Sequence, residues 1–227
     1  MSGTICCTSG RSSPGCSLKD SRRSTAPPPT SRSAWLSTPS LPPDARRIIV
    51  FGQSGSGKTT LARRIGARLG VPAIELDSLF HQPNWQPTPD EEFRAKVIAA
   101  LDAHPEGWVV DGNYRAIREV MLPRANAIVC LRLPFRIVYP RLVKRTLRRM
   151  WTREELWNTN RESFRLSFMS RNSILLWGIS HWRAHTRNLD EALRTIPHTA
   201  PVVELYTPRG VDSFVRSLPT PAGQTLA

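Results

Sequence analysis

The sequence lacks any long hydrophobic run. Its longest apolar candidate, residues 174–179, is far shorter than the roughly 20 residues that a helix needs to span a bilayer. The N-terminus also lacks the apolar stretch that is typical of a secretory signal. These absences predict a cytoplasmic protein without a membrane segment.

Cysteine is scarce, with four residues in 227, and none of the four has the paired spacing of a metal site. Three of them, Cys6, Cys7 and Cys16, lie in the N-terminal region described below. The fourth, Cys130, lies in an apolar run and is predicted to be a small core residue. We therefore expect no structural disulfide and no cysteine-bound metal.

Acidic residues are also few: 18 Asp and Glu stand against 32 Lys and Arg, which gives a net charge of +14. The excess is concentrated in residues 136–194, which hold thirteen basic and five acidic side chains. A basic segment of this kind attracts polyanions, so nucleic acid has to be considered as a partner.

Residues 1–45 contain eleven Ser and seven Pro and almost no apolar periodicity. Such a segment cannot bury enough surface to offset the entropy of ordering it, so we predict a disordered tail. Alternatively, these residues precede the true start of the protein. A single domain is expected over 46–218, followed by a flexible C-terminus at 219–227.

From Arg47 the sequence alternates between short apolar runs and helical patterns. Strands are predicted near 48–51, 73–76, 108–111, 127–133 and 202–206, and helices near 58–69, 88–104, 136–194 and 210–218. Thr88, Pro89 and Glu91 have the pattern of an N-cap, a first helical residue and a capping box. The alternation predicts an α/β fold with a parallel sheet, whose ligands bind beyond the carboxyl ends of the strands.

A glycine-rich motif follows the first predicted strand and precedes the first predicted helix. Its pattern, G-x-x-x-x-G-K-[ST], is that of a phosphate-binding loop. Its backbone N–H groups and the helix N-terminus face phosphate oxygens, the lysine reaches the β and γ phosphates, and the threonine hydroxyl ligates Mg²⁺. The predicted nucleotide-binding residues are Gly52, Gln53, Ser54, Gly55, Ser56, Gly57, Lys58, Thr59 and Thr60.

Two further sets of signals narrow the class of protein. The Asp-x-x-Gly and Asn-Lys-x-Asp motifs of GTPases are absent, since residues 111–114 read Asp-Gly-Asn-Tyr. The short chain, with an Arg-rich segment before its last strand, resembles small-molecule kinases of the adenylate, shikimate and gluconate kinase type. The stretches at 75–85, 110–114 and 156–162 more closely resemble the bacterial adenylate-kinase-like proteins known as DNA topology modulation proteins.

This resemblance covers roughly 46–218 and implies a three-layer P-loop NTPase fold. It implies a five-stranded parallel sheet in the order 2-3-1-4-5, helices on both faces and an Arg-rich helical lid. It also implies ATP as the nucleotide and an unassigned acceptor. Pro140 departs from the pattern, and we expect a helix start or a kink there.

Two aspartates end predicted strands. Asp111 follows the third strand, which the implied order places beside the phosphate loop, so we expect it to bind Mg²⁺ together with Thr59. Asp77 follows the second strand and is expected to bind the acceptor hydroxyl and accept its proton. The alternative for both is a turn or cap residue. His81 and Trp85 either line the acceptor pocket or pack against the domain, and Asn113 and Tyr114 either cap a helix or contact substrate.

The basic segment has three interpretations. Arg141, Arg145 and Arg148 are spaced to share a helix face, with Arg149 adjacent, and residues 148–165, including Arg161, are placed to form a mobile lid. Arginines there stabilise the charge of a transferring phosphoryl group. Alternatively, they form a solvated face, or they bind nucleic acid together with interleaved aromatic residues such as Trp157, which could instead be core.

We therefore predict an ATP- and Mg²⁺-dependent kinase for a small-molecule acceptor, with Lys58, Asp77, Arg145, Arg149 and Arg161 as catalytic residues. The alternative is an ATP-dependent nucleic-acid-binding protein that affects DNA topology. The sequence identifies neither the acceptor nor the oligomeric state.

Overall fold

The computed structural model describes residues 41–152, 158, 160 and 182–219. The chain divides into two units, Met1–Ser37 and Thr38–Ala227, and every described residue belongs to the second. The boundaries predicted for the tail and the C-terminus therefore stay predictions.

Within the described residues, five strands form one parallel sheet in the order β2-β3-β1-β4-β5. The strands are β1 (Arg47–Gly52), β2 (Ala73–Glu75), β3 (Trp108–Asp111), β4 (Ala127–Leu131) and β5 (Val202–Leu205). β1 is central: its residue Val50 lies opposite Asp111 of β3, and its last residue, Gly52, lies opposite Leu131 of β4. The predicted α/β sheet and its strand order are confirmed.

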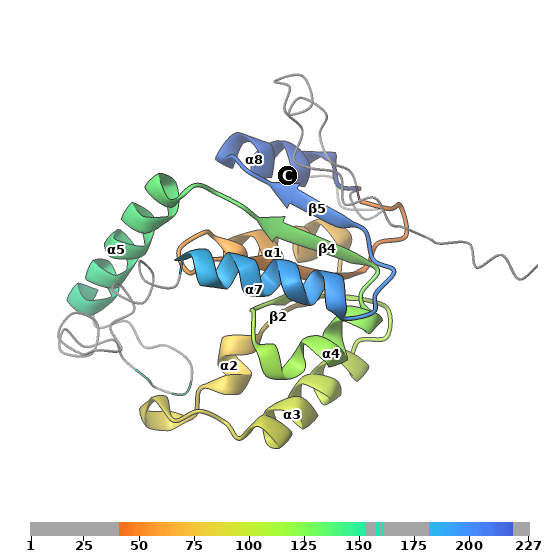
Figure 1. The fold of residues 1–227 in the computed structure, drawn as a ribbon, viewed down its shortest axis with the longest axis horizontal. Coiled ribbons are helices and arrows are strands. Elements are labelled where there is room, and N and C mark those ends of the chain that lie inside the picture. Colours follow the sequence, from red (N-terminus) through yellow and green to blue (C-terminus); the bar gives the residue numbers. More distant parts are fainter. Residues whose placement is uncertain (1–40, 153–157, 159, 161–181, 220–227) are drawn as a thin grey trace, which may run out of the picture. The chain divides into compact units, whose positions relative to one another are not determined.

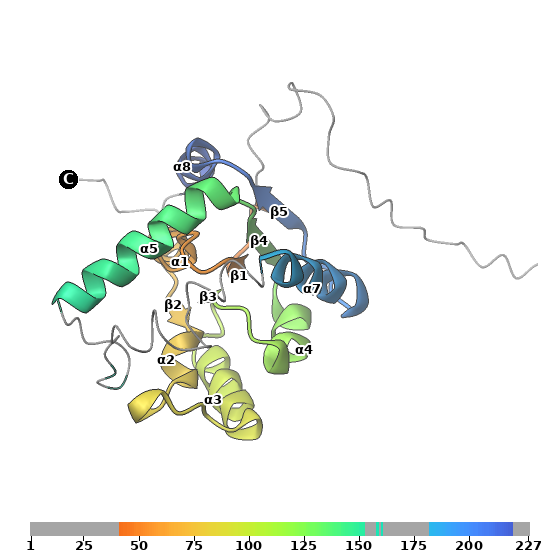
Figure 2. The same ribbon diagram turned by 60° about the vertical axis from the view of Figure 1, so that its left-hand side comes forward.

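Helices cover both faces of this sheet (Figure 1). They are α1 (Lys58–Leu69), α2 (Leu76–Phe80), α3 (Asp90–Asp102), α4 (Arg118–Met121), α5 (Phe135–Thr152), α7 (Trp182–Thr195) and α8 (Pro208–Ser217), with 3-10 turns η2 (Pro83–Trp85), η3 (Arg115–Ile117) and η4 (Leu122–Arg124). α1 and α8 pack on one face, while α3, α4 and α7 pack on the other. α5 extends outward from the carboxyl end of β4 (Figure 2).

Alternate residues of the central strand supply two separate cores. Ile48 and Val50 pack in the core under α1 and α8, whereas Ile49 and Phe51 pack in the core under α3, α4 and α7, and all four are fully buried. A strand that is buried on both faces appears in a sequence as a continuous apolar run. Cys130 in β4 is buried in the second core, as predicted.

The predicted capping box of α3 is wrong. The helix begins at Asp90 with Pro89 in the N-cap position, and no side chain caps it. Thr88 is instead buried, and its hydroxyl donates a hydrogen bond of 3.1 Å to the Leu79 carbonyl. The threonine hydroxyl thus binds the loop before α3 to α2. This buried hydrogen bond takes the place of the cap that the sequence predicted.

The helix start predicted at Pro140 is also wrong, because α5 begins at Phe135 and runs through the proline. An interior proline costs about 3 kcal/mol, since it removes one backbone hydrogen bond. Burial of Val138 and Leu142 on either side of it offsets that cost. Pro140 itself is exposed.

Most of the predicted lid, including Arg161 and Trp157, lies outside the described residues. None of the helices in the described ranges is long and apolar enough to cross a membrane.

Candidate active site

The phosphate loop, residues 52–59, connects β1 to the first turn of α1. Gly55 and Gly57 have φ angles of 83° and 94°, in the left-handed region that glycine tolerates best. A Cβ atom on Gly55 would lie 2.8 Å from Cβ of Leu142, so this glycine also lets α5 pack against the loop. The curled backbone stands at the N-terminus of α1, where N–H groups and the helix dipole favour an anion.

Asp111 lies beside this loop because β3 pairs directly with β1. Thr59 Oγ1 donates a hydrogen bond to Asp111 Oδ2, and Lys58 Nζ lies 4.0 Å from Asp111 Oδ1. The carboxylate is 4% exposed. Burial raises the pKa of Asp111, and the charge of Lys58 and the hydrogen bond from Thr59 oppose that rise.

These side chains fit a magnesium ion that is bound mainly by phosphate and water. Asp111 Oδ1 is buried and has no hydrogen-bond partner among the described residues. In the same part of the chain, no group of three or more His, Cys, Asp or Glu could hold a metal alone. Mg²⁺ typically keeps several waters and takes one or two protein oxygens besides substrate phosphates. Thr59 and Asp111 are the residues that could supply those oxygens.

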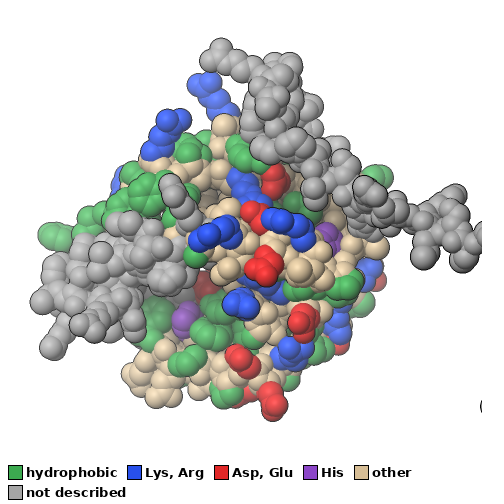
Figure 3. Space-filling view, viewed as in Figure 1, with side chains coloured by type: hydrophobic (Ala, Val, Ile, Leu, Met, Phe, Trp, Pro, Cys, Tyr) green, Lys and Arg blue, Asp and Glu red, His purple; other side chains and the backbone are tan. Residues whose placement is uncertain are grey.

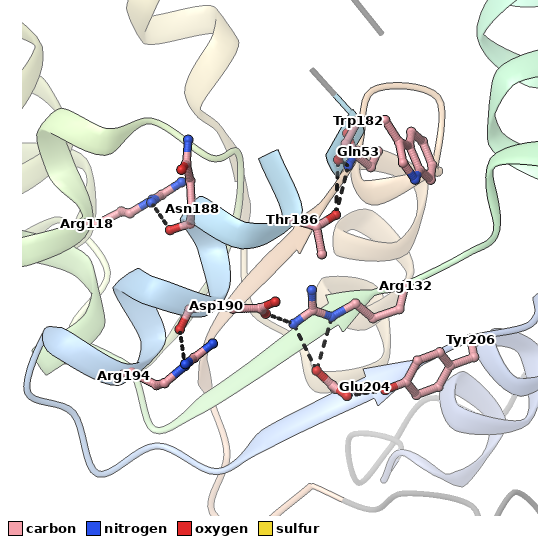
Figure 4. A network of polar contacts seen from close by, with 10 residues as sticks. All are labelled: Gln53, Arg118, Arg132, Trp182, Thr186, Asn188, Asp190, Arg194, Glu204 and Tyr206. Atoms are coloured by element: carbon pink, nitrogen blue, oxygen red, sulfur yellow. Dashed lines mark hydrogen bonds and ion pairs between the residues drawn. The ribbon is translucent and has the colours of Figure 1, made fainter. Parts of the chain in front are cut away.

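Two other loop residues contact helices far along the chain. Gln53 is 7% exposed, and its Nε2 donates to the Trp182 carbonyl at 2.9 Å and to Thr186 Oγ1 at 3.3 Å, both at the start of α7 (Figure 4). Ser54 Oγ accepts a hydrogen bond of 3.1 Å from Arg145 of α5. The sequence motif allows any residue at these two positions, so neither contact could be predicted from it.

The arginines of α5 differ in burial. Arg145 and Arg149 are half-buried, and Arg145 contacts the phosphate loop, near which Leu142 also lies. Arg141 and Arg148, which were predicted to share a face with Arg145, are exposed. In its burial Arg149 therefore resembles Arg145, whereas Arg141 and Arg148 do not.

Asp77 lies in α2 and not at a strand end, because β2 stops at Glu75 and the chain enters the helix at once. Its Oδ1 accepts a hydrogen bond from the Tyr114 hydroxyl. Burial raises the pKa of Tyr114 above its usual value and Asp77 raises it further, so the phenol keeps its proton and stays a donor. Asp77 also makes a small contribution to the raised pKa of Asp111.

A turn at residues 81–87 follows α2 and has a strained backbone. Asn84 and Trp85 have φ angles of 61° and 59°, and such values are rare for a residue as bulky as tryptophan. Asn160 is 3% exposed and clamps the turn: its Oδ1 accepts from Trp85 N and its Nδ2 donates to the Gln82 carbonyl, each at 2.9 Å. The His81 and Trp85 rings meet edge to face at 5.2 Å.

Two arginines that the sequence interpretation overlooked hold α7 in place (Figure 4). Arg132, just after β4, is paired with Asp190 of α7 and Glu204 of β5. Arg118 is 5% exposed; two of its nitrogens donate to Asn113 Oδ1 and a third donates to the Asn188 carbonyl at 3.0 Å. On the surface over α7, basic and acidic side chains are interspersed (Figure 3).

The structure thus brings together Lys58, Thr59, Asp111 and Arg145 around the phosphate loop, with Asp77 nearby. Thr60 is exposed on the first turn of α1. Tyr114, which the sequence left undecided, is the hydrogen-bond partner of Asp77.

Known proteins resemble this chain over parts of its length. A family model described as an AAA domain matches residues 48–163, a little more than half of the chain. The human protein "Threonine synthase-like 1" is 38% identical over 63 residues, which are 28% of this chain and 8% of that protein. The "Adenylate kinase isoenzyme 6 homolog" of Caenorhabditis elegans is 30% identical over 116 residues, 45% of this chain and 63% of the relative.

The chain therefore covers less than two thirds of the length of either curated relative. Among solved structures, a gluconokinase from Sinorhizobium meliloti 1021 aligns with 21% identity and a TM-score of 0.45, over 76% of this chain and 88% of that one. From the family match, which includes the phosphate loop and Asp111, we conclude that this chain belongs to the AAA domain family of P-loop proteins.

Proposed function

We propose that this protein is an ATP-dependent kinase that phosphorylates a hydroxyl group of a small molecule. One observation carries the proposal: two carboxylates in different surroundings lie near one phosphate loop. Asp111 is buried against Thr59 and Lys58, as a metal-side carboxylate would be. Asp77 is half-buried and takes a hydrogen bond from Tyr114. Relatives that are kinases by name, including a shikimate kinase and a cytidylate kinase, support the assignment.

In the proposed reaction, the loop N–H groups and Lys58 bind the β and γ phosphates of ATP. Thr59 and Asp111 would hold Mg²⁺, which neutralises phosphate charge when bound. Asp77 accepts the proton of the acceptor hydroxyl as its oxygen bonds to the γ-phosphorus. The bond from that phosphorus to the β–γ bridging oxygen breaks, and ADP leaves.

In this proposal, arginines stabilise the charge of the phosphoryl group during transfer. Negative charge spreads over the equatorial oxygens of the transferring group, and a guanidinium at that place lowers the barrier. Arg145 reaches the loop through Ser54, and Arg149 lies one turn further along α5. We assign the same role to Arg161 from its place in the sequence. The protein would act in the cytoplasm.

The test is ADP formation measured across a panel of nucleosides, nucleotides, sugars and cyclic acids. Lys58→Ala should reduce acceptor-stimulated turnover at least about 100-fold, because it removes a charge from the phosphate site. Lys96→Ala is the matched control, since Lys96 lies on α3 in an ion pair with Glu92. Turnover that no acceptor stimulates, or that Lys58→Ala leaves intact, would contradict the proposal.

A second candidate function is nucleic-acid binding, with a role in DNA topology. The observation that favours it is the composition of α5, which holds six Lys and Arg and no acidic residue. It predicts DNA or RNA binding that weakens steeply with salt and that charge reversal at Arg148 and Arg149 reduces. Absence of binding at low salt would eliminate it. We rank it second because Arg145 of this helix donates a hydrogen bond to Ser54 of the phosphate loop.

A further inference from the structure

The acceptor side of the site is negatively charged where the hydroxyl would bind. Among the described residues, Asp77 takes a hydrogen bond from Tyr114 and forms no ion pair with a Lys or Arg. The nearby cations serve other carboxylates: Arg63 pairs with Glu75, and Lys58 lies next to Asp111. A phosphate or carboxylate group on the acceptor would therefore be repelled at this position.

A row of aromatic rings begins at Tyr114, the hydrogen-bond partner of this carboxylate. The Phe80 ring lies 4.5 Å from the Tyr114 ring and 5.1 Å from the His81 ring, and Trp85 continues the row. All four side chains are half-buried, so part of each is accessible. Burial lowers the pKa of His81, and this effect is larger than the opposing effect of the Asp77 charge. The imidazole is therefore neutral at pH 7. Among the described residues, such a row offers flat apolar surface near the charge of Asp77.

The position of Trp85 in this row is maintained at a cost. Its backbone is in the left-handed region, next to Asn84 in the same region, and strain of this kind persists only where surrounding contacts impose it. Here the buried Asn160 side chain, 75 positions after Trp85 in the sequence, imposes it through its hydrogen bonds to Trp85 N and the Gln82 carbonyl. This turn therefore fixes the place of the Trp85 ring beside His81, where the tryptophan is partly accessible.

We propose that the acceptor is an uncharged hydroxyl compound with a planar aromatic ring, of the nucleoside class. Its ring packs against His81 and Trp85, and its hydroxyl reaches Asp77. Arg115 follows Tyr114 in the sequence but does not line this site. Together with Arg118, it lines a separate cavity of about 200 Å³ beside α7. The inference rests on the proposed kinase function.

The experiment compares four acceptor classes at equal concentration with Mg²⁺·ATP: the common nucleosides, their 5′-monophosphates, shikimate with gluconate, and ring-free polyols such as glycerol. ADP formation and product mass are measured. Nucleosides should raise ADP formation at least tenfold more than the other classes. A preference for monophosphates, sugar acids or polyols would overturn the nucleoside assignment and leave the kinase standing. Rates equal to the Lys58→Ala blank with every compound would overturn both.

Variants then test the two named contacts on the best acceptor. Trp85→Ala should raise the acceptor KM at least tenfold and leave the KM for ATP within twofold, and Trp85→Phe should restore most of the loss. Asp77→Asn should lower kcat at least 100-fold and also narrow the preference for nucleosides over monophosphates, because it removes the repelling charge. Asp102→Asn is the matched control, since Asp102 pairs with Arg124 at the end of α3. An unchanged acceptor KM in Trp85→Ala, with native circular dichroism, would overturn the ring contact.

Discussion

Two glycines of the phosphate loop allow the packing of α5 to be measured separately from backbone strain. Gly55 and Gly57 both have left-handed φ angles, so an alanine at either position costs about 1–2 kcal/mol in backbone energy. Their surroundings differ. A Cβ on Gly55 would lie 2.8 Å from Cβ of Leu142 and 3.0 Å from the Val138 carbonyl oxygen, whereas a Cβ on Gly57 would meet nothing within 4 Å.

Gly55→Ala must therefore also displace α5, and overpacking of this kind typically costs a further 1–3 kcal/mol. For a domain of this size, each kcal/mol shifts Tm by about 2–4 °C. We expect Gly57→Ala to lower Tm by roughly 2–8 °C, and Gly55→Ala to lower it by roughly 2–12 °C more.

Thermal and urea unfolding of the nucleotide-free protein measure both variants, with equal m-values as the check for two-state behaviour. A second readout is ATP affinity, which Gly55→Ala should reduce because Arg145 moves with α5. Equal destabilisation by the two alanines would refute the reasoning, since it would mean that α5 does not pack against Gly55.

Three other predictions concern single side chains. Arg145→Met should weaken Mg²⁺·ATP binding about 10- to 100-fold in calorimetry, because a hydrogen bond from a charged group is worth about 1.5–3 kcal/mol, while exposed Arg141→Met should change it less than twofold. Arg132→Met should lower the free energy of unfolding, measured in urea, by about 1–3 kcal/mol. This loss is smaller than that for a fully buried ion pair, because the two carboxylate partners of Arg132 are about one-third exposed. Burial lowers the pKa of His81 in the folded protein below the ordinary value of 6.5, so just below pH 6.5 this imidazole takes up a proton only in the unfolded chain. The free energy of unfolding should therefore be highest above pH 6.5 and decrease as the pH falls below that value. His81→Gln should flatten this part of the urea-midpoint profile between pH 5.5 and 7.5, and an unchanged slope would refute the assignment.

The sheet could be predicted from sequence because its central strands are buried on both faces. β1, β3 and β4 appear as continuous apolar runs, and turn or helix signals separate them. The strand order came from family resemblance rather than from the residues. Helix boundaries were less predictable, as Thr88 shows: its spacing to Glu91 fits a capping box, but a carbonyl in the preceding loop is its actual partner.

The candidate site likewise has parts that could be predicted from the sequence and parts that could not. The phosphate loop is local in sequence, and Asp111 follows from its strand and the sheet order, so both could be found. The contacts of Tyr114 with Asp77 and of Asn160 with the turn before α3 join residues 37 and about 75 positions apart. No periodicity or motif encodes such pairs, because each depends on how two loops approach each other after folding.

The arginines of α5 show how the buried residues of a helix determine what its charged residues can do. Spacing alone placed Arg141, Arg145 and Arg148 on one face, but it could not say which face turns toward the nucleotide. Burial of Leu142 against Gly55 fixes the rotation of the helix, and Arg145, three positions later, then reaches Ser54 of the loop. The apolar residues between the charges therefore carry the information about which charges reach the loop.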